Sequence, residues 1–137
     1  MAVRVFQAME QAGFEPCFVA RDRRLSDFGP VLIEDLDGPV HPLNGVVAAL
    51  QAGGGVLAPC DLPFLPALAF SSLEWGQLEA SCPLLGKLGR AWLPRATMFL
   101  AQQRSVRAFA QAAHRVTMPS EWLRNVNRPS DLDRPSS

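Results

Sequence analysis

Two aspartates come directly after short apolar runs of the sequence, where their carboxylates could hold a metal ion. Asp35 follows PVLIE (30–34), and Asp61 follows VLAPC (56–60). In open α/β sheets, ligands bind in the crevice at the carboxyl ends of the strands. Magnesium is commonly held there by one or two carboxylates together with substrate phosphates and water. The two aspartates therefore indicate a site for a nucleoside triphosphate and its metal ion, although each could instead only end a strand or cap a turn.

The segment around Asp61 reads GGGVLAPCDLPFLP (53–66). Pro63 and Pro66 favour extended backbone at the residues that precede them, so the chain that leaves Asp61 is expected to be stiff. The three glycines resemble a phosphate loop, but such loops follow a strand and open a helix. These glycines follow an expected helix and open an expected strand, so we interpret them as the end of the helix.

Other polar residues give weaker indications. Lys87 lies in GKLG (86–89), which lacks the rest of the phosphate-loop pattern. His41 could face the same cleft as Asp35, or it could form a hydrogen bond within its own loop. His114 follows an alanine-rich helix, where a positive charge suits the helix dipole, and we assign it no chemistry. No G-x-S-x-G motif or serine–histidine–acid pattern supports a hydrolase.

The composition is that of an ordinary globular chain. The sequence has 137 residues, 48% of them hydrophobic and 19% charged, with a formal net charge of zero. We expect one domain over residues 1–137, with no electrostatic affinity for nucleic acid or for a membrane. No apolar run reaches the roughly 20 residues that span a bilayer, and the N-terminus lacks a secretory signal, so we expect a cytoplasmic protein. The three separated cysteines are expected to be buried, reduced thiols.

The order of apolar segments predicts an α/β fold. We expect a helix over 2–12, strands over 14–20 and 30–35, a helix over 43–51 and a strand over 56–60. Continuous apolar strands that alternate with helices indicate a parallel sheet covered on both faces. Farther along, we expect a strand over 80–86, helices over 94–103 and 105–114, and a short strand over 114–120.

Four segments in this order resemble the molybdenum cofactor guanylyltransferases, the MobA family. The segments are VLIED, HPLNGVVAAL, VLAPCDLPFLP and NVNRPSDL. They are similar to the family's acidic strand end, G-P-L-x-G helix start, C-D-x-P-F/Y metal-site strand and N-[VI]-N-x-P-x-[DE]-L terminus. The likeness covers roughly residues 2–66 and 80–133. It implies a three-layer Rossmann-like nucleotidyltransferase sheet with helices on both faces.

The resemblance also implies an activity and a set of site residues. Asp61 matches the catalytic aspartate that binds magnesium and the triphosphate, and Asp35 matches an acidic residue that contacts the guanine nucleotide. Asn125 and Asn127 match asparagines on the acceptor side, although asparagine side chains also fix turns by bonding to backbone. The implied reaction transfers GMP from GTP to molybdenum-bound molybdopterin in molybdenum cofactor biosynthesis. The implied cofactor is magnesium, and molybdoenzyme-maturation proteins are further expected partners.

The sequence departs from the family in its phosphate loop. The family's L-A-G-G-x-S-x-R-M-G-x-D-K segment is absent, Lys87 is not a substitute for its lysine, and His41 replaces the first glycine of G-P-L-x-G. We therefore expect an N-terminally incomplete domain, and little or no GTP-dependent transfer by a chain that starts at Met1.

Two alternatives remain open at this point. One is a related nucleotidyltransferase with another acceptor, such as a cytidylyltransferase. The other is a non-catalytic truncated paralogue that binds the cofactor or a partner protein. Loss of a central strand would expose its apolar neighbours, so homodimerisation, poor solubility or marginal folding is also expected.

Overall fold

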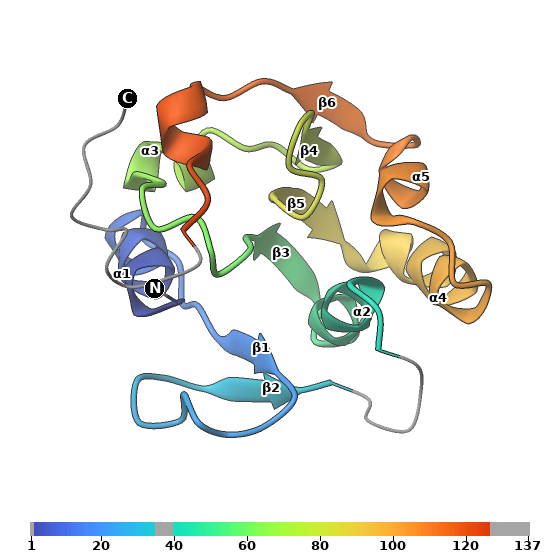
Figure 1. Cartoon of the computed structure of the whole chain (residues 1–137), viewed down its shortest axis with the longest axis horizontal. Helices are drawn as coiled ribbons and strands as arrows, with labels where there is room; N and C mark the ends of the chain where they lie inside the picture. Colours follow the sequence, from blue (N-terminus) through green and yellow to red (C-terminus); the bar gives the residue numbers. More distant parts are fainter. Residues whose placement is uncertain (1, 35–39, 127–137) are drawn as a thin grey trace.

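A computed structural model describes residues 2–34 and 40–126 of the chain (Figure 1). Its elements in chain order are α1 (Ala2–Gln11), β1 (Phe18–Ala20), β2 (Val31–Ile33), α2 (Leu43–Gln51), β3 (Gly54–Leu57), α3 (Ala67–Ser71), β4 (Gln77–Glu79), β5 (Gly86–Gly89), the 3-10 turn η1 (Arg90–Trp92), α4 (Leu93–Ala101), α5 (Val106–Ala110), β6 (His114–Val116) and the 3-10 turn η2 (Ser120–Leu123). Within the described part, no helix has the length and apolar character needed to cross a membrane.

The strands form two sheets. β1 and β2 are parallel, with Phe18 opposite Val31, as the sequence predicts. The second sheet has the order β3-β5-β4-β6, in which β4 and β6 are parallel and β5 is antiparallel to both of its neighbours. The expectation of a wholly parallel sheet is therefore wrong for β3, which pairs with β5 rather than with β2.

The strand expected over 80–86 is also wrong. This segment connects β4 to β5, and it turns where the Leu85 N–H donates to the Cys82 carbonyl at 3.0 Å. Pro83 has no N–H to offer a sheet ladder, which suits a connection better than a strand. The two strands on either side of this turn then pair with each other as a hairpin.

Helices cover both faces of the four-stranded sheet, and each face has its own apolar core. On one face, Val5 and Ala8 of α1 pack with Phe70 of α3 and with Leu85 before β5. On the other face, α2, α4 and α5 pack over the strands, with these buried side chains: Leu43, Val46, Leu50, Leu78, Leu88, Ala96, Phe99, Phe109 and Ala110. The expected layered α/β architecture is confirmed by this arrangement.

Helix ends are set by local hydrogen bonds. The helix α2 has the predicted bounds, with Pro42 before its first turn and Gly53 (φ +120°) after its last. At the end of α1, the Phe14 N–H donates to the Met9 carbonyl at 3.1 Å around Gly13, which has a φ of +91°. This is the Schellman arrangement, which favours glycine at the residue with positive φ.

The three glycines at 53–55 do more than end the helix. Gly53 follows α2, as interpreted, but Gly54 and Gly55 are the first residues of β3. Gly54 has a φ of +76°, and a Cβ added there would collide with the backbone oxygen of Leu88. The absence of a side chain at Gly54 therefore permits a close approach between β3 and β5.

Candidate functional site

Asp61 lies in a turn beyond β3 rather than at the end of the strand itself. The strand ends at Leu57, and residues 58–61 lead into a turn that contains the half-buried Asp61. The chain that follows is anchored, because Leu62 and Leu65 are only 4% and 3% exposed in the core beneath α1 and α3. These apolar anchors, together with the prolines between and after them, fix the position of the Asp61 backbone.

The C-terminal part of the described chain packs against this turn. The Val126 N–H donates to the backbone carbonyl of Asp61 at 2.9 Å, and the Val126 side chain is buried. The Arg124 guanidinium lies 5.4 Å from the centre of the Phe64 ring, in the same turn region. Figure 1 shows η2, just before this segment, close to α3. Asn125, which is exposed, is thereby held beside the Asp61 turn.

The segments that carry two of the four predicted site residues are therefore brought together. Asp61 and Asn125 are separated by more than sixty positions in the sequence, and the Val126 hydrogen bond joins their segments. Asp35 and Asn127 lie outside the described residues, so their predicted roles remain predictions. Arg124 was not singled out from the sequence, although its place next to the asparagine motif would have been a usable signal.

The charge of Asp61 acts on two nearby thiols. The expectation of buried cysteines is wrong, because Cys17 and Cys60 are exposed and Cys82 is half-buried. Partial burial of its sulfur still raises the pKa of the Cys60 thiol above its usual value, and the negative charge of Asp61 raises that pKa further. Burial also raises the pKa of Cys82, and the charges of Glu79 and Asp61 contribute in the same direction. The Asp61 carboxylate is thus near the connection between β4 and β5 as well as its own turn. The Asp61 turn, the connection between β4 and β5 and the segment that ends at Val126 therefore lie close together.

Glu79 fixes the connection that carries Cys82. Its side chain is 2% exposed, and its Oε2 accepts hydrogen bonds from the Ser81 N–H at 2.8 Å, the Ser81 hydroxyl at 2.8 Å and the Cys82 N–H at 2.6 Å. Its Oε1 accepts from the Met118 N–H at 3.5 Å. Buried carboxylates need such partners, because an unpaired buried charge is very costly. Sequence reasoning missed this residue, since it belongs to no motif.

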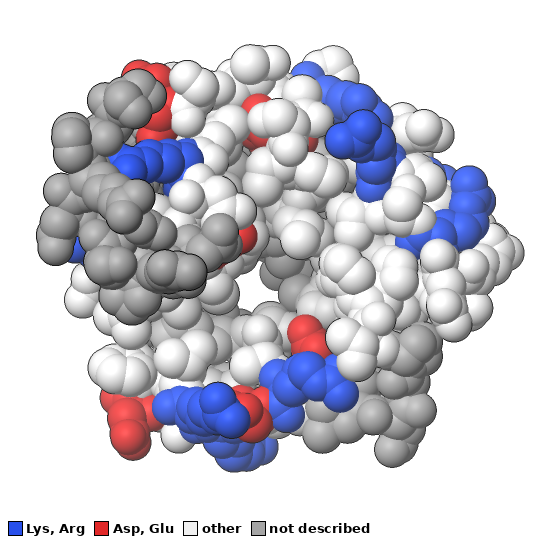
Figure 2. All heavy atoms as spheres, viewed as in Figure 1, with Lys and Arg blue, Asp and Glu red and all other residues white. Residues whose placement is uncertain are grey.

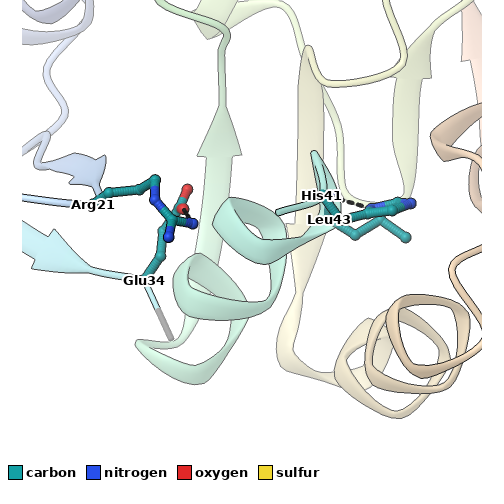
Figure 3. Close-up of polar contacts among 4 residues, drawn as sticks. All are labelled: Arg21, Glu34, His41 and Leu43. Atoms are coloured by element: carbon teal, nitrogen blue, oxygen red, sulfur yellow. Dashed lines mark hydrogen bonds and ion pairs between the residues drawn. The ribbon is translucent and has the colours of Figure 1, made fainter. Parts of the chain in front are cut away.

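The other acidic strand end lies against α2. The Glu34 carboxylate is 4.0 Å from the Arg21 guanidinium, and a Cβ added at Gly45 would come within 3.1 Å of Glu34 Oε1. His41 Nδ1 instead accepts a hydrogen bond from the Leu43 N–H at 3.0 Å. Figure 3 shows His41 on the opposite side of α2 from Glu34 and Arg21. His41 therefore forms a hydrogen bond within its own loop, which was the alternative to a role in the cleft.

The donor set around Asp61 suits magnesium only together with a substrate. In the part of the chain that the structure describes, no group of three or more His, Cys, Asp and Glu side chains could hold a metal ion. A single carboxylate is nevertheless a common protein contribution to a magnesium site in which phosphates and water supply the other ligands. The described residues thus fit a metal that arrives with a nucleotide, and they do not fit a permanent protein cage.

A large cavity opens next to this site. Its volume is about 520 Å³, and α1, α2, β1, β3 and the segment up to Cys60 line it. Figure 2 shows the molecule hollowed near its centre. Asp61 and Asn125 are not among the lining residues, so the cavity ends just before the carboxylate. Its walls are mainly apolar side chains and strand backbone.

Comparison with known proteins identifies the fold. No protein-family model matches the sequence, and no curated protein matches it. A solved structure from Aquifex aeolicus VF5 (Aq1419) has a TM-score of 0.77 and 18% identity, over 93% of this chain and 78% of that one. Molybdopterin-guanine dinucleotide biosynthesis protein A from Archaeoglobus fulgidus has a TM-score of 0.68 and 22% identity, over 94% of this chain and 80% of that one.

This chain has the same fold as both proteins. The predicted layered α/β architecture is confirmed by that likeness. About a fifth of each neighbouring chain has no counterpart here, since the present chain covers 78% and 80% of them. At these identities the likeness concerns the fold alone.

Proposed function

We propose that this protein is a nucleotidyltransferase whose site is built around Asp61 and Asn125. The observation that carries the proposal is the 2.9 Å hydrogen bond from Val126 to the Asp61 carbonyl. This bond joins the Asp61 turn to the segment that carries Asn125, which supports the proposal that the two residues serve one site. Enzymes that transfer a nucleotidyl group need both substrates held in line, and positioning supplies much of the rate.

The specific reaction that we propose is transfer of GMP from GTP to the phosphate of molybdenum-bound molybdopterin, with release of pyrophosphate. Two independent observations support this choice over other acceptors. The four sequence segments occur in the order typical of the MobA family, and a solved structure with the same fold is named molybdopterin-guanine dinucleotide biosynthesis protein A. A related nucleotidyltransferase with another acceptor, such as a cytidylyltransferase, is the second candidate.

Each site residue has a distinct proposed role. Asp61 would bind magnesium directly, and the bound ion would neutralise charge on the triphosphate. The Asn125 carboxamide would donate a hydrogen bond to the acceptor and orient its phosphate. The Arg124 guanidinium would add positive charge at the edge of the same turn. No side chain need act as a general base, because a phosphate oxygen is already ionised at neutral pH.

Calorimetric titration with GTP tests the nucleotide half of the proposal. We expect saturable GTP binding that requires magnesium, and a loss of affinity of about tenfold or more for Asp61→Asn, which corresponds to about 1.4 kcal/mol. Asp27→Asn is the matched control, since Asp27 is an exposed aspartate of the loop between β1 and β2. Equal affinity in the presence and absence of magnesium, or an Asp61→Asn variant that binds like the parent, would contradict the proposal.

A transfer assay tests the acceptor half. With molybdopterin and radiolabelled GTP, Asn125→Ala should raise the KM for the acceptor and leave GTP affinity unchanged. Nucleotide binding is the primary readout, because it does not depend on supply of the acceptor. Competition by CTP at equal concentration would favour the cytidylyltransferase. Binding of molybdopterin with no detectable transfer would favour the non-catalytic alternative.

A further inference from the structure

The formal net charge of zero is the sum of two oppositely charged parts of the chain. Residues 80–120 contain one lysine and five arginines and no aspartate or glutamate, whereas residues 1–79 contain ten acidic residues and four arginines. Protein surfaces ordinarily mix charges of both signs, because a field of one sign repels itself. The positive charge of residues 80–120 therefore needs an explanation beyond solubility.

Some of these arginines have contacts within the fold. The Arg95 guanidinium donates to the backbone carbonyls of Phe109 and Ala108, both at 3.0 Å, and so holds the end of α5. Arg107 and Arg115 differ from it. Both are exposed, and neither forms an ion pair with a residue that the structure describes.

The fold places Arg107 and Arg115 next to each other. Arg115 of β6 lies opposite Leu78 in the parallel register with β4, so the two side chains are on the same face of the sheet. Leu78 is buried in the core that α5 covers, which puts the Arg115 side chain beside α5. Arg107 is on α5, one helical turn before Ala110. Figure 2 shows the blue of Lys and Arg gathered over α5 and β6.

A small pit lies between these two arginines. Its volume is about 20 Å³, and Arg107, Arg115 and the backbone side of Ala80 and Ser81 border it. A space of this size admits one water-sized group, such as a single oxygen of a carboxylate. The planar guanidinium has the geometry to bind a carboxylate through two parallel hydrogen bonds.

Glu79 also borders the pit, but it does not neutralise the two arginines. Its Oε2 accepts from Ser81 and from the Cys82 N–H, and its Oε1 accepts from the Met118 N–H. The carboxylate is thus bound to its own loop, and no ion pair joins it to a described arginine. One internal negative charge therefore faces two positive charges, and the pit retains a positive excess.

We propose that the Arg107–Arg115 face is a docking surface for an acidic segment of a partner protein. One aspartate or glutamate of the segment inserts a carboxylate oxygen into the pit and accepts hydrogen bonds from both guanidinium groups. Neighbouring acidic residues of the segment interact with Arg104, whose exposed guanidinium lies 4.1 Å from the centre of the Phe99 ring. Neither Asp61 nor Asn125 belongs to this face, so the proposal is independent of the proposed nucleotidyltransferase activity.

The chemistry of the face favours a protein segment over single-stranded nucleic acid. Proteins that bind single strands stack the bases on exposed aromatic side chains. In residues 80–120, all of which the structure describes, Phe99 and Phe109 are buried and Trp92 is packed against the same core. The face thus offers positive charge without a stacking platform, whereas arginine is enriched at protein–protein interfaces.

A second copy of the chain is a poorer complement than an acidic segment. Its acidic residues lie among arginines, and two of them are already in ion pairs. The Asp22 carboxylate is 3.1 Å from the Arg24 guanidinium, and the Glu34 carboxylate is 4.0 Å from that of Arg21. The charge balance therefore favours a different, more acidic protein as the partner.

Fluorescence anisotropy with a synthetic peptide tests the proposal on the full chain. The probe is a fluorescein-labelled peptide of four Glu-Ala repeats at low ionic strength, where surface charges are least screened. The matched control peptide has four Gln-Ala repeats and the same label. We expect the glutamate peptide to bind at least tenfold more tightly than the glutamine peptide.

Arginine variants then locate the binding surface. Arg107→Gln and Arg115→Gln should each weaken binding of the glutamate peptide about threefold or more, and the double variant about tenfold or more. Arg23→Gln is the control, because it removes the same charge from an exposed position in the loop between β1 and β2. It should leave the affinity unchanged. Arg107→Lys keeps the charge but loses the planar fork, so it should also weaken binding.

Four results would overturn the proposal. The first is equal affinity for the two peptides. The second is an effect of Arg107→Gln and Arg115→Gln no larger than that of Arg23→Gln, or an Arg107→Lys variant that binds like the parent. The third is tighter binding of an eight-nucleotide DNA single strand that depends on the same two arginines, because the ligand would then be nucleic acid. The fourth is a salt-sensitive dimer in sedimentation analysis that Arg107→Gln dissociates, because the occupant would then be a second copy.

Discussion

Removal of the Glu79 carboxylate should destabilise the fold more than any exposed acidic substitution. Glu79 is 2% exposed, and in Glu79→Ala the N–H groups of Cys82 and Met118 lose their acceptor in a buried or half-buried place. Each unsatisfied buried donor costs about 1–3 kcal/mol. Ser81 is exposed, so water can accept the hydrogen bonds that its N–H and hydroxyl donate to Glu79. The expected loss in free energy of unfolding is therefore about 3 kcal/mol.

Urea unfolding followed by circular dichroism measures this loss. Glu79→Gln keeps one carbonyl oxygen and the side-chain volume, so it should lose about half as much as Glu79→Ala. Glu74→Ala is the control, because Glu74 is an exposed glutamate just before β4, and it should change stability by less than about 0.5 kcal/mol. A Glu79→Ala variant within about 1 kcal/mol of the parent would refute the reasoning, since a cost that small means the donors find other partners.

Three further predictions follow from local geometry. Gln103 has a φ of +52° after α4, so Gln103→Gly should raise the free energy of unfolding by about 0.5–1 kcal/mol; a decrease in urea titration would contradict this. Gly54→Ala should lower it by about 2 kcal/mol or more, because the new Cβ meets the Leu88 backbone oxygen and φ is positive; an unchanged melting curve would contradict this. In a chain that keeps Cys60 as its only thiol, Asp61→Asn should speed iodoacetamide labelling at pH 8, because loss of the carboxylate lowers the pKa of Cys60 and raises its thiolate fraction; an equal or slower rate would contradict the placement of Asp61.

Local patterns predicted those elements whose ends are marked in the sequence. The bounds of α2 are predicted correctly because Pro42 and Gly53 stand on either side of a periodic apolar run. The parallel pairing of β1 and β2 also follows from their apolar character and the connection between them. The Asp61 and Asn125 segments were recognised as motifs, and the structure brings them together.

Long-range pairing could not be read from the same patterns. The antiparallel pairing of β3 with β5 depends on the close approach that Gly54 permits, and a run of glycines is also compatible with a turn. Glu79 has a structural role because partners from Ser81 to Met118 surround it, and no local signal reports such partners. Likewise, whether a strand edge is unpaired depends on which strands lie side by side in space, and the residues of one strand do not report its neighbours.

Paramagnetic broadening by Mn²⁺ bound with GTP tests the central claim most directly, because it reports the place of the metal and its neighbours together. In an NMR spectrum of the full chain, substoichiometric Mn²⁺ with GTP should selectively broaden the amide signals of Asp61, Asn125 and Val126, and should leave Asp27 unaffected. Asp61→Asn should abolish the broadening at all three positions. Broadening centred elsewhere in the fold, or broadening of Asn125 and Val126 that persists in Asp61→Asn, would contradict a shared site at the Asp61 turn.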